Sequence, residues 1–138
     1  METNFLQIQQ EYKDSMPDYI LFLMNARNQF KFFHWQTHSF SEHESFDNFV
    51  NILDDFLDKF VEAYQGKYER LKVLGDGNSG QFISNYESVD GLAYLKALYE
   101  VLNVKMVSCL SDQDSDLLNL IDEIVLNLNK LLFLLTLE

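Results

Sequence analysis

The stretch that decides the fold is residues 43–64, which read HESFDNFVNILDDFLDKFVEAY. Its apolar side chains recur at spacings of three and four residues, and on a helical wheel they fill an arc of roughly 120°. They are Phe46, Phe49, Val50, Leu53, Phe56, Leu57, Phe60 and Tyr64. A strand would need alternation with a period of two, and this stretch has none. It is therefore predicted to form a long helix with one face in a core.

Helix starts are marked by serines that stand three residues before an acidic side chain, which is the spacing of a capping box. Ser15, with Pro17 in the first turn, predicts a first helix that runs to about His38. Ser41 is predicted to open the second helix, which reaches at least Tyr64. The histidines of the chain then fall where these two helices meet.

The remaining chain repeats the pattern after a glycine-rich interruption. GDGNSG at 75–80 predicts a flexible loop, and Ser88 is predicted to cap a third helix over about 89–109. Ser111 is predicted to cap a fourth helix that runs nearly to the C-terminus. Four long helices with one long connection between the second and third predict an all-α, ferritin-like four-helix bundle.

Length and charge limit the classes of protein to consider. The chain has 138 residues, enough for one domain (1–138), with 1–14 expected to be an arm or short helix. Its formal net charge is -12, which disfavours nucleic-acid binding through a basic face. We expect no membrane span and no signal peptide, and hence a cytoplasmic protein.

Two apolar features carry further expectations. Cys109 is the only cysteine, and its apolar neighbours predict an inert, buried thiol. In the fourth helix, Leu134 and Leu137 widen the apolar surface beyond one stripe, which predicts a contact between subunits.

The three histidines, His34, His38 and His43, lie within ten residues of one another. Clustered imidazoles are typical of metal sites, although exposed loop histidines are the plainer interpretation. On the second helix His43 and Asp47 form an i, i+4 pair, which can direct two ligand atoms at one ion. Further carboxylates lie on the same side of this helix, along the flank of the apolar arc, and they strengthen the metal hypothesis. A solvated acidic face remains the alternative.

Asp58 and Glu62 form a second i, i+4 pair further along the same stripe. His43 and Asp58 are 15 residues apart, which is ~22 Å along a helix, too far for one ion. A second copy of the helix, lying antiparallel about a twofold axis near Asn51 to Leu53, would bring the two pairs together. Such a dimer would hold two equivalent intersubunit sites, with Val61 as interface packing.

These motifs resemble those of the miniferritins, the Dps family of ferritin-like cage proteins. Three motifs carry the resemblance: His34-Trp35, His43-x-x-x-Asp47 and Asp58-x-x-x-Glu62. The HWQT and EAYQGKY segments are also similar to those of uncharacterised Dps-like proteins of viruses and phages. Compared with the family, the interval from His34 to His43 is about three residues shorter and lacks the customary glycine, and the basic N-terminal tail is absent.

The resemblance implies an iron-binding ferroxidase that stores iron and protects against oxidative stress. Metal would be held by His34, His43 and Asp47 of one subunit with Asp58 and Glu62 of its neighbour, and these residues would also be the catalytic set. Iron is the implied metal, with zinc or manganese as alternatives. The implied partner is a second copy, within a homo-oligomer of up to twelve subunits, in a host cytoplasm if the source is viral.

Two readings of the chemistry remain open at this point. One is the ferroxidase, which oxidises Fe(II) with peroxide or dioxygen. The other is a non-catalytic Dps-like assembly or interaction protein whose metal is structural or absent. Core packing is the expected role of Trp35 and Tyr64, with radical quenching as the alternative, and His38 is expected to be structural or peripheral to the metal.

Overall fold

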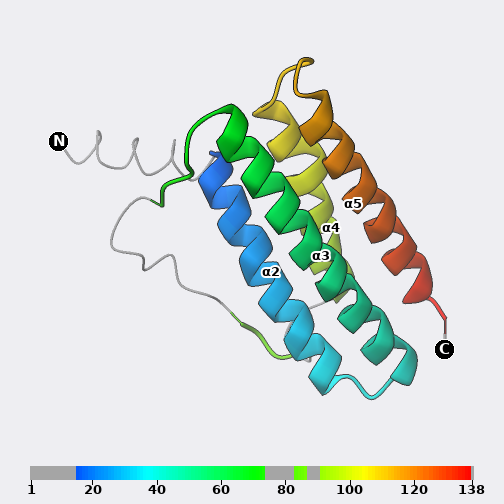
Figure 1. The fold of residues 1–138 in the computed structure, drawn as a ribbon. Helices are drawn as coiled ribbons and strands as arrows, with labels where there is room; N and C mark the ends of the chain where they lie inside the picture. The colour runs from blue at the N-terminus through cyan, green and yellow to red at the C-terminus, as the bar shows by residue number, and fades with distance from the viewer. Residues whose placement is uncertain (1–14, 74–82, 87–90, 138) are drawn as a thin grey trace.

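The computed structural model describes residues 15–73, 83–86 and 91–137. This part of the chain contains four helices and no strand, which confirms the prediction of an all-α fold (Figure 1). The helices are α2 (Met16–Gln36), α3 (Phe40–Lys67), α4 (Gly91–Glu100) with its π-helical continuation η1 (Val101–Met106), and α5 (Ser115–Leu134).

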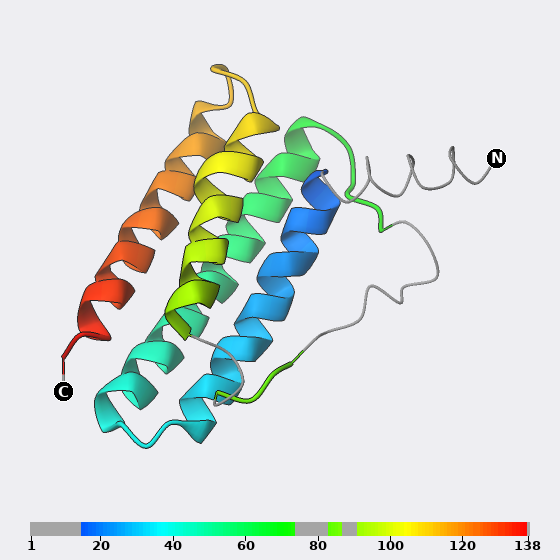
Figure 2. The same ribbon diagram turned by 180° about the vertical axis from the view of Figure 1, so that it is seen from behind.

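The helices pack as two pairs. α2 and α3 form one antiparallel hairpin and α4 and α5 form the other, as the front and back views both show (Figures 1 and 2). α3 packs against α5, and α2 packs against η1. α3 and α4 run in the same direction, so α4 begins at the opposite end of the bundle from the end of α3 (Figure 1).

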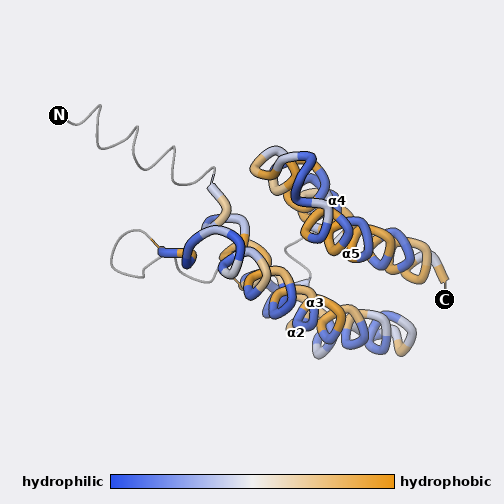
Figure 3. The backbone as a smooth tube through the Cα atoms, turned by 45° about the horizontal axis from the view of Figure 1, so that its top comes forward, coloured by the Kyte–Doolittle hydropathy of each residue, from blue (hydrophilic) through white to orange (hydrophobic). Residues whose placement is uncertain are grey.

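The core lies between the two hairpins. Hydrophobic residues occur along every helix, as the tube coloured by hydropathy shows (Figure 3). The predicted stripe of α3 is confirmed for six residues, which are all buried: Phe46, Phe49, Val50, Leu53, Phe56 and Phe60. Leu57 and Tyr64, at the edge of the stripe, are half-buried. Leu92 lies in the first turn of α4, at the edge of the bundle, and is exposed.

The start of α3 differs from the prediction. Ser39, not Ser41, caps the helix: its Oγ accepts a hydrogen bond of 3.2 Å from the backbone N–H of Glu42. The Thr37 hydroxyl donates to the Glu42 carboxylate at 2.7 Å and fixes the same turn. Only three residues therefore separate α2 from α3, and His43 lies in the first turn of α3.

The start of α5 is also later than predicted. Asp114 is the cap residue, and the Ser111 backbone N–H donates to its carboxylate at 2.9 Å. Cys109 lies in the preceding turn and is exposed, so the prediction of a buried thiol was wrong. Partial desolvation raises the pKa of this thiol, which keeps it protonated near neutral pH.

Some predictions fall outside the described residues: the arm over 1–14, the glycine-rich loop at 75–80 and the Ser88 cap. Among the helices that the structure does describe, none combines the length and the apolar character needed to cross a membrane.

Candidate metal site between α2 and α3

The short turn between α2 and α3 brings His34 and His43 together. Their rings stack with centroids 3.8 Å apart and planes 18° from parallel. Each ring bonds to the backbone of the other residue: His34 Nδ1 lies 2.6 Å from the His43 carbonyl oxygen, and His43 Nδ1 lies 2.7 Å from the His34 carbonyl oxygen. The two predicted ligands are therefore neighbours, held by a reciprocal pair of hydrogen bonds.

These hydrogen bonds determine the tautomer of both histidines. A carbonyl oxygen only accepts, so Nδ1 carries the proton and donates in both rings. The neutral ring then has its lone pair on Nε2, and neither Nε2 makes a hydrogen bond within the described part of the chain. Imidazoles that bind metals are commonly oriented in this way, by a hydrogen bond from the second ring nitrogen to a carbonyl.

Asp47 lies next to this pair, as its i, i+4 spacing from His43 predicted. Its Oδ1 is 3.9 Å from His34 Nε2 and 2.9 Å from Lys31 Nζ. The hydrogen bond from Lys31 holds the pKa of the Asp47 carboxyl below its usual value, so this group is ionised at neutral pH. One copy therefore brings two imidazoles and one carboxylate to the same end of the α2–α3 hairpin.

A segment from beyond α3 supports this end of the hairpin. The Tyr86 ring packs against Phe33, the residue before His34, with centroids 4.8 Å apart. The Gln36 side chain accepts a hydrogen bond of 2.9 Å from the Tyr86 backbone N–H, and the Tyr86 hydroxyl donates to Glu42. The last turn of α2 and the first turn of α3 are thus tied to a common segment.

The other two predicted ligands, Asp58 and Glu62, are exposed on the same helix and do not reach the histidines. Fifteen residues of continuous helix separate His43 from Asp58, a rise of about 22 Å. No group of three or more His, Cys, Asp or Glu side chains in the described part of one copy is arranged to hold a metal ion. One copy thus brings His34, His43 and Asp47 together and leaves Asp58 and Glu62 apart from them.

His38 and Trp35 flank the histidine pair without joining it. His38 lies in the turn and is exposed. The Trp35 side chain is 62% exposed, so core packing was the wrong expectation for this residue. Phe40, also exposed, stacks loosely on His43 with centroids 6.3 Å apart. Tyr64 is half-buried and packs against Phe60, as expected for a residue at the edge of the core.

Two basic residues of the site were missed by sequence reasoning. Lys31 bonds Asp47, and Arg27 Nε lies 3.1 Å from Asp54 Oδ1. Both basic residues of α2 therefore bind carboxylates of α3. A signal for them was present: they are four residues apart, and Lys31 is three residues before His34, so all three share one face of α2.

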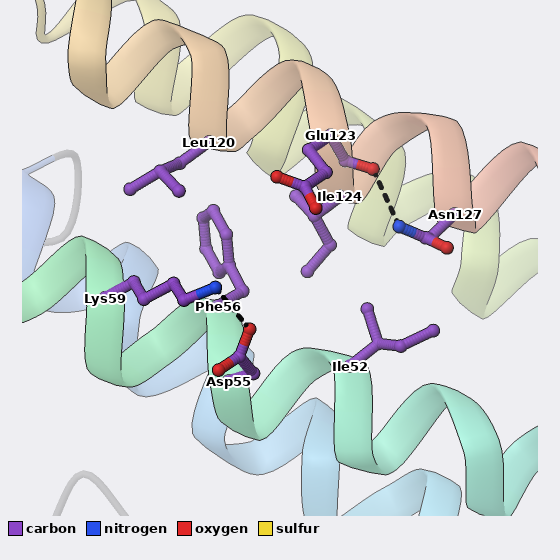
Figure 4. A pocket seen from close by; sticks show the side chains of 8 residues that line it. All are labelled: Ile52, Asp55, Phe56, Lys59, Leu120, Glu123, Ile124 and Asn127. Atoms are coloured by element: carbon purple, nitrogen blue, oxygen red, sulfur yellow. Dashed lines mark hydrogen bonds and ion pairs between the residues drawn. The ribbon is translucent and has the colours of Figure 1, made fainter.

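A small hollow lies between α3 and α5, on another face of the bundle from the histidine pair (Figure 4). Its volume is about 30 Å³, enough for a water molecule or two but not for a larger ligand. Two of the charged groups at its rim pair with each other, Asp55 with Lys59 at 2.9 Å, and the third, Glu123, lies across from them on α5 (Figure 4). This hollow is therefore too small to be a candidate functional site, and the candidate remains the group formed by His34, His43 and Asp47.

Comparison with known proteins gives one match. The sequence profile of a family described as "Family of unknown function (DUF5856)" matches residues 34–135. No curated protein and no solved structure matches the chain significantly. The matched range covers most of the chain, including all five predicted ligands, α3 and α5. The protein therefore belongs to DUF5856, a family of unknown function.

Proposed function

We propose that the protein is a Dps-type ferroxidase that oxidises Fe(II) and sequesters the ferric product at sites between twofold-related subunits. The observation that carries the proposal is the reciprocal bonding of His34 and His43, which directs both Nδ1 atoms inwards. Each imidazole is left with Nε2 as the nitrogen able to bind a metal ion. Asp47 adds an ionised carboxylate 3.9 Å from one of them.

The stacking of the two rings bears on how many ions such a site holds. An imidazole binds a metal in the plane of its ring, at about 2.0–2.1 Å for zinc. The two ring planes are only 18° from parallel and the centroids are 3.8 Å apart, so the planes do not meet near either Nε2. A single ion therefore does not suit both rings in this arrangement. We infer a site for two ions, one per imidazole.

Asp58 and Glu62 of a second copy would complete the ligand set. Because His43 with Glu62, and Asp47 with Asp58, are equally spaced about the middle of α3, one antiparallel twofold contact brings both pairs together. Neither Asp58 nor Glu62 has an ion-pair partner among the described residues. Glu62 of one copy would then lie opposite His43 of the other, and Asp58 opposite Asp47.

Iron in this proposal is a substrate. Imidazole with oxygen donors suits Fe(II), and equally Mn(II) or Zn(II), which would then act as competitors. Two Fe(II) ions supply the two electrons that reduce one hydrogen peroxide to two hydroxide ions. The role of the chain is to hold two ions close together, with histidine tautomers fixed in advance and carboxylates that offset the cationic charge.

Aerobic addition of Fe(II) to the purified protein tests the proposal, with the rise of ferric-oxo absorbance as the readout. We expect oxidation faster than in buffer, and loss of that excess rate in Asp58→Ala and Glu62→Ala. Asp55→Ala is the matched control, since Asp55 lies on the same helix but pairs with Lys59 on another face. A wild-type rate equal to that of buffer, or equal rates in all the variants, would refute the ferroxidase.

A second candidate is an assembly protein of the same design whose metal is structural or absent. It is favoured by the apolar side chains exposed on the outer face of α5 and just beyond it: Leu126, Phe133 and Leu137. These suit contacts between subunits. The sequence predicted such a contact from Leu134, which is half-buried, and Leu137, which is exposed. Tight binding of Zn²⁺ without any acceleration of Fe(II) oxidation would select this candidate.

A further inference from the structure

A groove runs along the outside of the α2–α3 hairpin, further from the interhelical turn than His34, His43 and Asp47. It has a volume of about 630 Å³ and combines an apolar floor with a charged rim. The floor is formed by Ile20, Met24, Leu57 and Val61, and the rim by Arg27, Asn28, Asp54 and Asp58. Met24 is 47% exposed, so the floor is open to solvent in a single copy.

Trp35 projects from the same hairpin near its other end. It is the only tryptophan of the chain and is 62% exposed. Side chains on a helix lean towards its N-terminus, and the ring of Trp35 accordingly lies 5.9 Å from Lys31 Nζ. Since Lys31 bonds Asp47, the indole lies level with Asp47 of α3.

Trp35 is not among the residues that line the groove of its own copy, and the apolar floor is further away than the rim. Met24 is 11 residues before Trp35 on α2, a rise of about 16 Å. The molecule therefore carries an exposed aromatic side chain at one end of this face and an unfilled apolar groove towards the other. A surface of this kind is self-complementary under a twofold rotation.

We propose that Trp35 of a second copy fills this groove. The inference rests on the twofold arrangement of the proposed function, which sets Asp47 of one copy opposite Asp58 of the other. Because the indole is level with Asp47, the same rotation brings it level with Asp58, on the rim of the groove. In the metal-free dimer, Lys31 of one copy would also lie close to the exposed Asp58 and Glu62 of the other, which adds charge complementarity.

Self-association of the full chain in EDTA tests this without any metal. Sedimentation equilibrium of Trp35→Ala should give a dimer dissociation constant at least about 30-fold higher than that of the wild type, the effect of losing an interface hot spot. Val104→Ala is the matched control, because Val104 is an apolar side chain of similar exposure, 54%, but lies on η1. It should leave the dimer intact.

Tryptophan fluorescence supplies a second readout, since only Trp35 reports. Emission should shift to shorter wavelength as the wild type dimerises. Met24→Asp, which adds a charge to the groove floor at an exposed position, should abolish that shift.

The outcomes separate this inference from the proposed function. A dimer that oxidises Fe(II) while its indole stays solvent-exposed overturns the inference alone. A blue-shifted indole in the monomer also overturns it, by assigning the contact to the same chain. A monomer at every concentration overturns both.

Discussion

The two ends of α3 carry polar clusters that differ in how far their hydrogen-bonding groups are satisfied within the chain. At its C-terminal end, Asp114 is 1% exposed and accepts hydrogen bonds from Lys67 Nζ at 2.8 Å, Tyr68 Oη at 2.6 Å and the Ser111 N–H at 2.9 Å. At its N-terminal end, His34 and His43 satisfy only Nδ1 and leave Nε2 without a hydrogen-bond partner among the described residues.

The difference distinguishes a structural cluster from one able to bind a ligand. A buried carboxylate whose partners are all supplied internally fixes the ends of two helices and has no capacity for anything else. Two oriented imidazoles with unused lone pairs can still form bonds. We therefore expect changes at the two ends to affect different measurements, binding at one and stability at the other.

The largest expected effect is a loss of Zn²⁺ affinity on substitution of a histidine at the N-terminal end of α3. His43→Gln removes one metal-binding nitrogen and the ring that stacks on His34, and should weaken Zn²⁺ binding at least about 100-fold. Isothermal titration calorimetry measures it. His38→Gln is the matched control, because His38 is exposed in the adjacent turn and makes none of these contacts. Equal losses in both variants would mean that the stacked pair is not the site.

The second largest expected effect is a loss of thermal stability on substitution of Asp114, at the C-terminal end of α3. Asp114→Asn keeps the size of the side chain but removes the charge that pairs with Lys67. It should lower Tm by about 5 °C or more and leave Zn²⁺ affinity unchanged. Thermal unfolding followed by circular dichroism measures the first quantity. A loss of Zn²⁺ binding in this variant would contradict the division between the two ends.

Stability should also depend on pH through Asp114. Its hydrogen bonds with Lys67, Ser111 and Tyr68 hold the pKa of this carboxyl well below the ordinary value of 3.8. A carboxyl with a lowered folded-state pKa stabilises the fold above its unfolded pKa, and this stabilisation is lost as the pH falls below it. Urea unfolding between pH 7 and pH 3 should show a smaller loss of stability in Asp114→Asn than in the wild type. If the free energy of unfolding fell by the same amount in both proteins over this pH range, Asp114 would not be the source of the acid sensitivity.

The smallest effect is expected from Lys31. Its ammonium occupies Asp47 at 2.9 Å, so a metal ion must replace it there. Lys31→Met keeps the length of the side chain without the charge, and should raise Zn²⁺ affinity about two- to five-fold, the worth of an exposed ion pair. Lys59→Met is the matched control: it frees Asp55 on another face of α3 and should leave Zn²⁺ affinity unchanged. Weaker binding in Lys31→Met would show that the lysine assists the site.

Much of the fold follows from local pattern. The three- and four-residue periodicity of Phe46 to Phe60 identified α3 and its buried face, because burial of one helix face demands that spacing. Helix starts were less predictable. Ser39 and Ser41 both stand three residues before a glutamate, and the choice depended on Thr37, which binds Glu42 across the turn. The exposure of Cys109 was predicted wrongly, because it depends on where the helix ends: η1 ends before Cys109, which lies in an exposed turn.

For the site, the sequence by itself determined which side chains share a face of α3, since helical geometry fixes the direction of each residue from its number. His43 and Asp47 were therefore predictable as neighbours. Only the tertiary structure decided that His34 stacks on His43, that each bonds the other's carbonyl oxygen, and that Lys31 and Arg27 bind the carboxylates of α3. These contacts join two helices, and their register depends on a three-residue turn and on core packing, which no periodicity within one helix encodes.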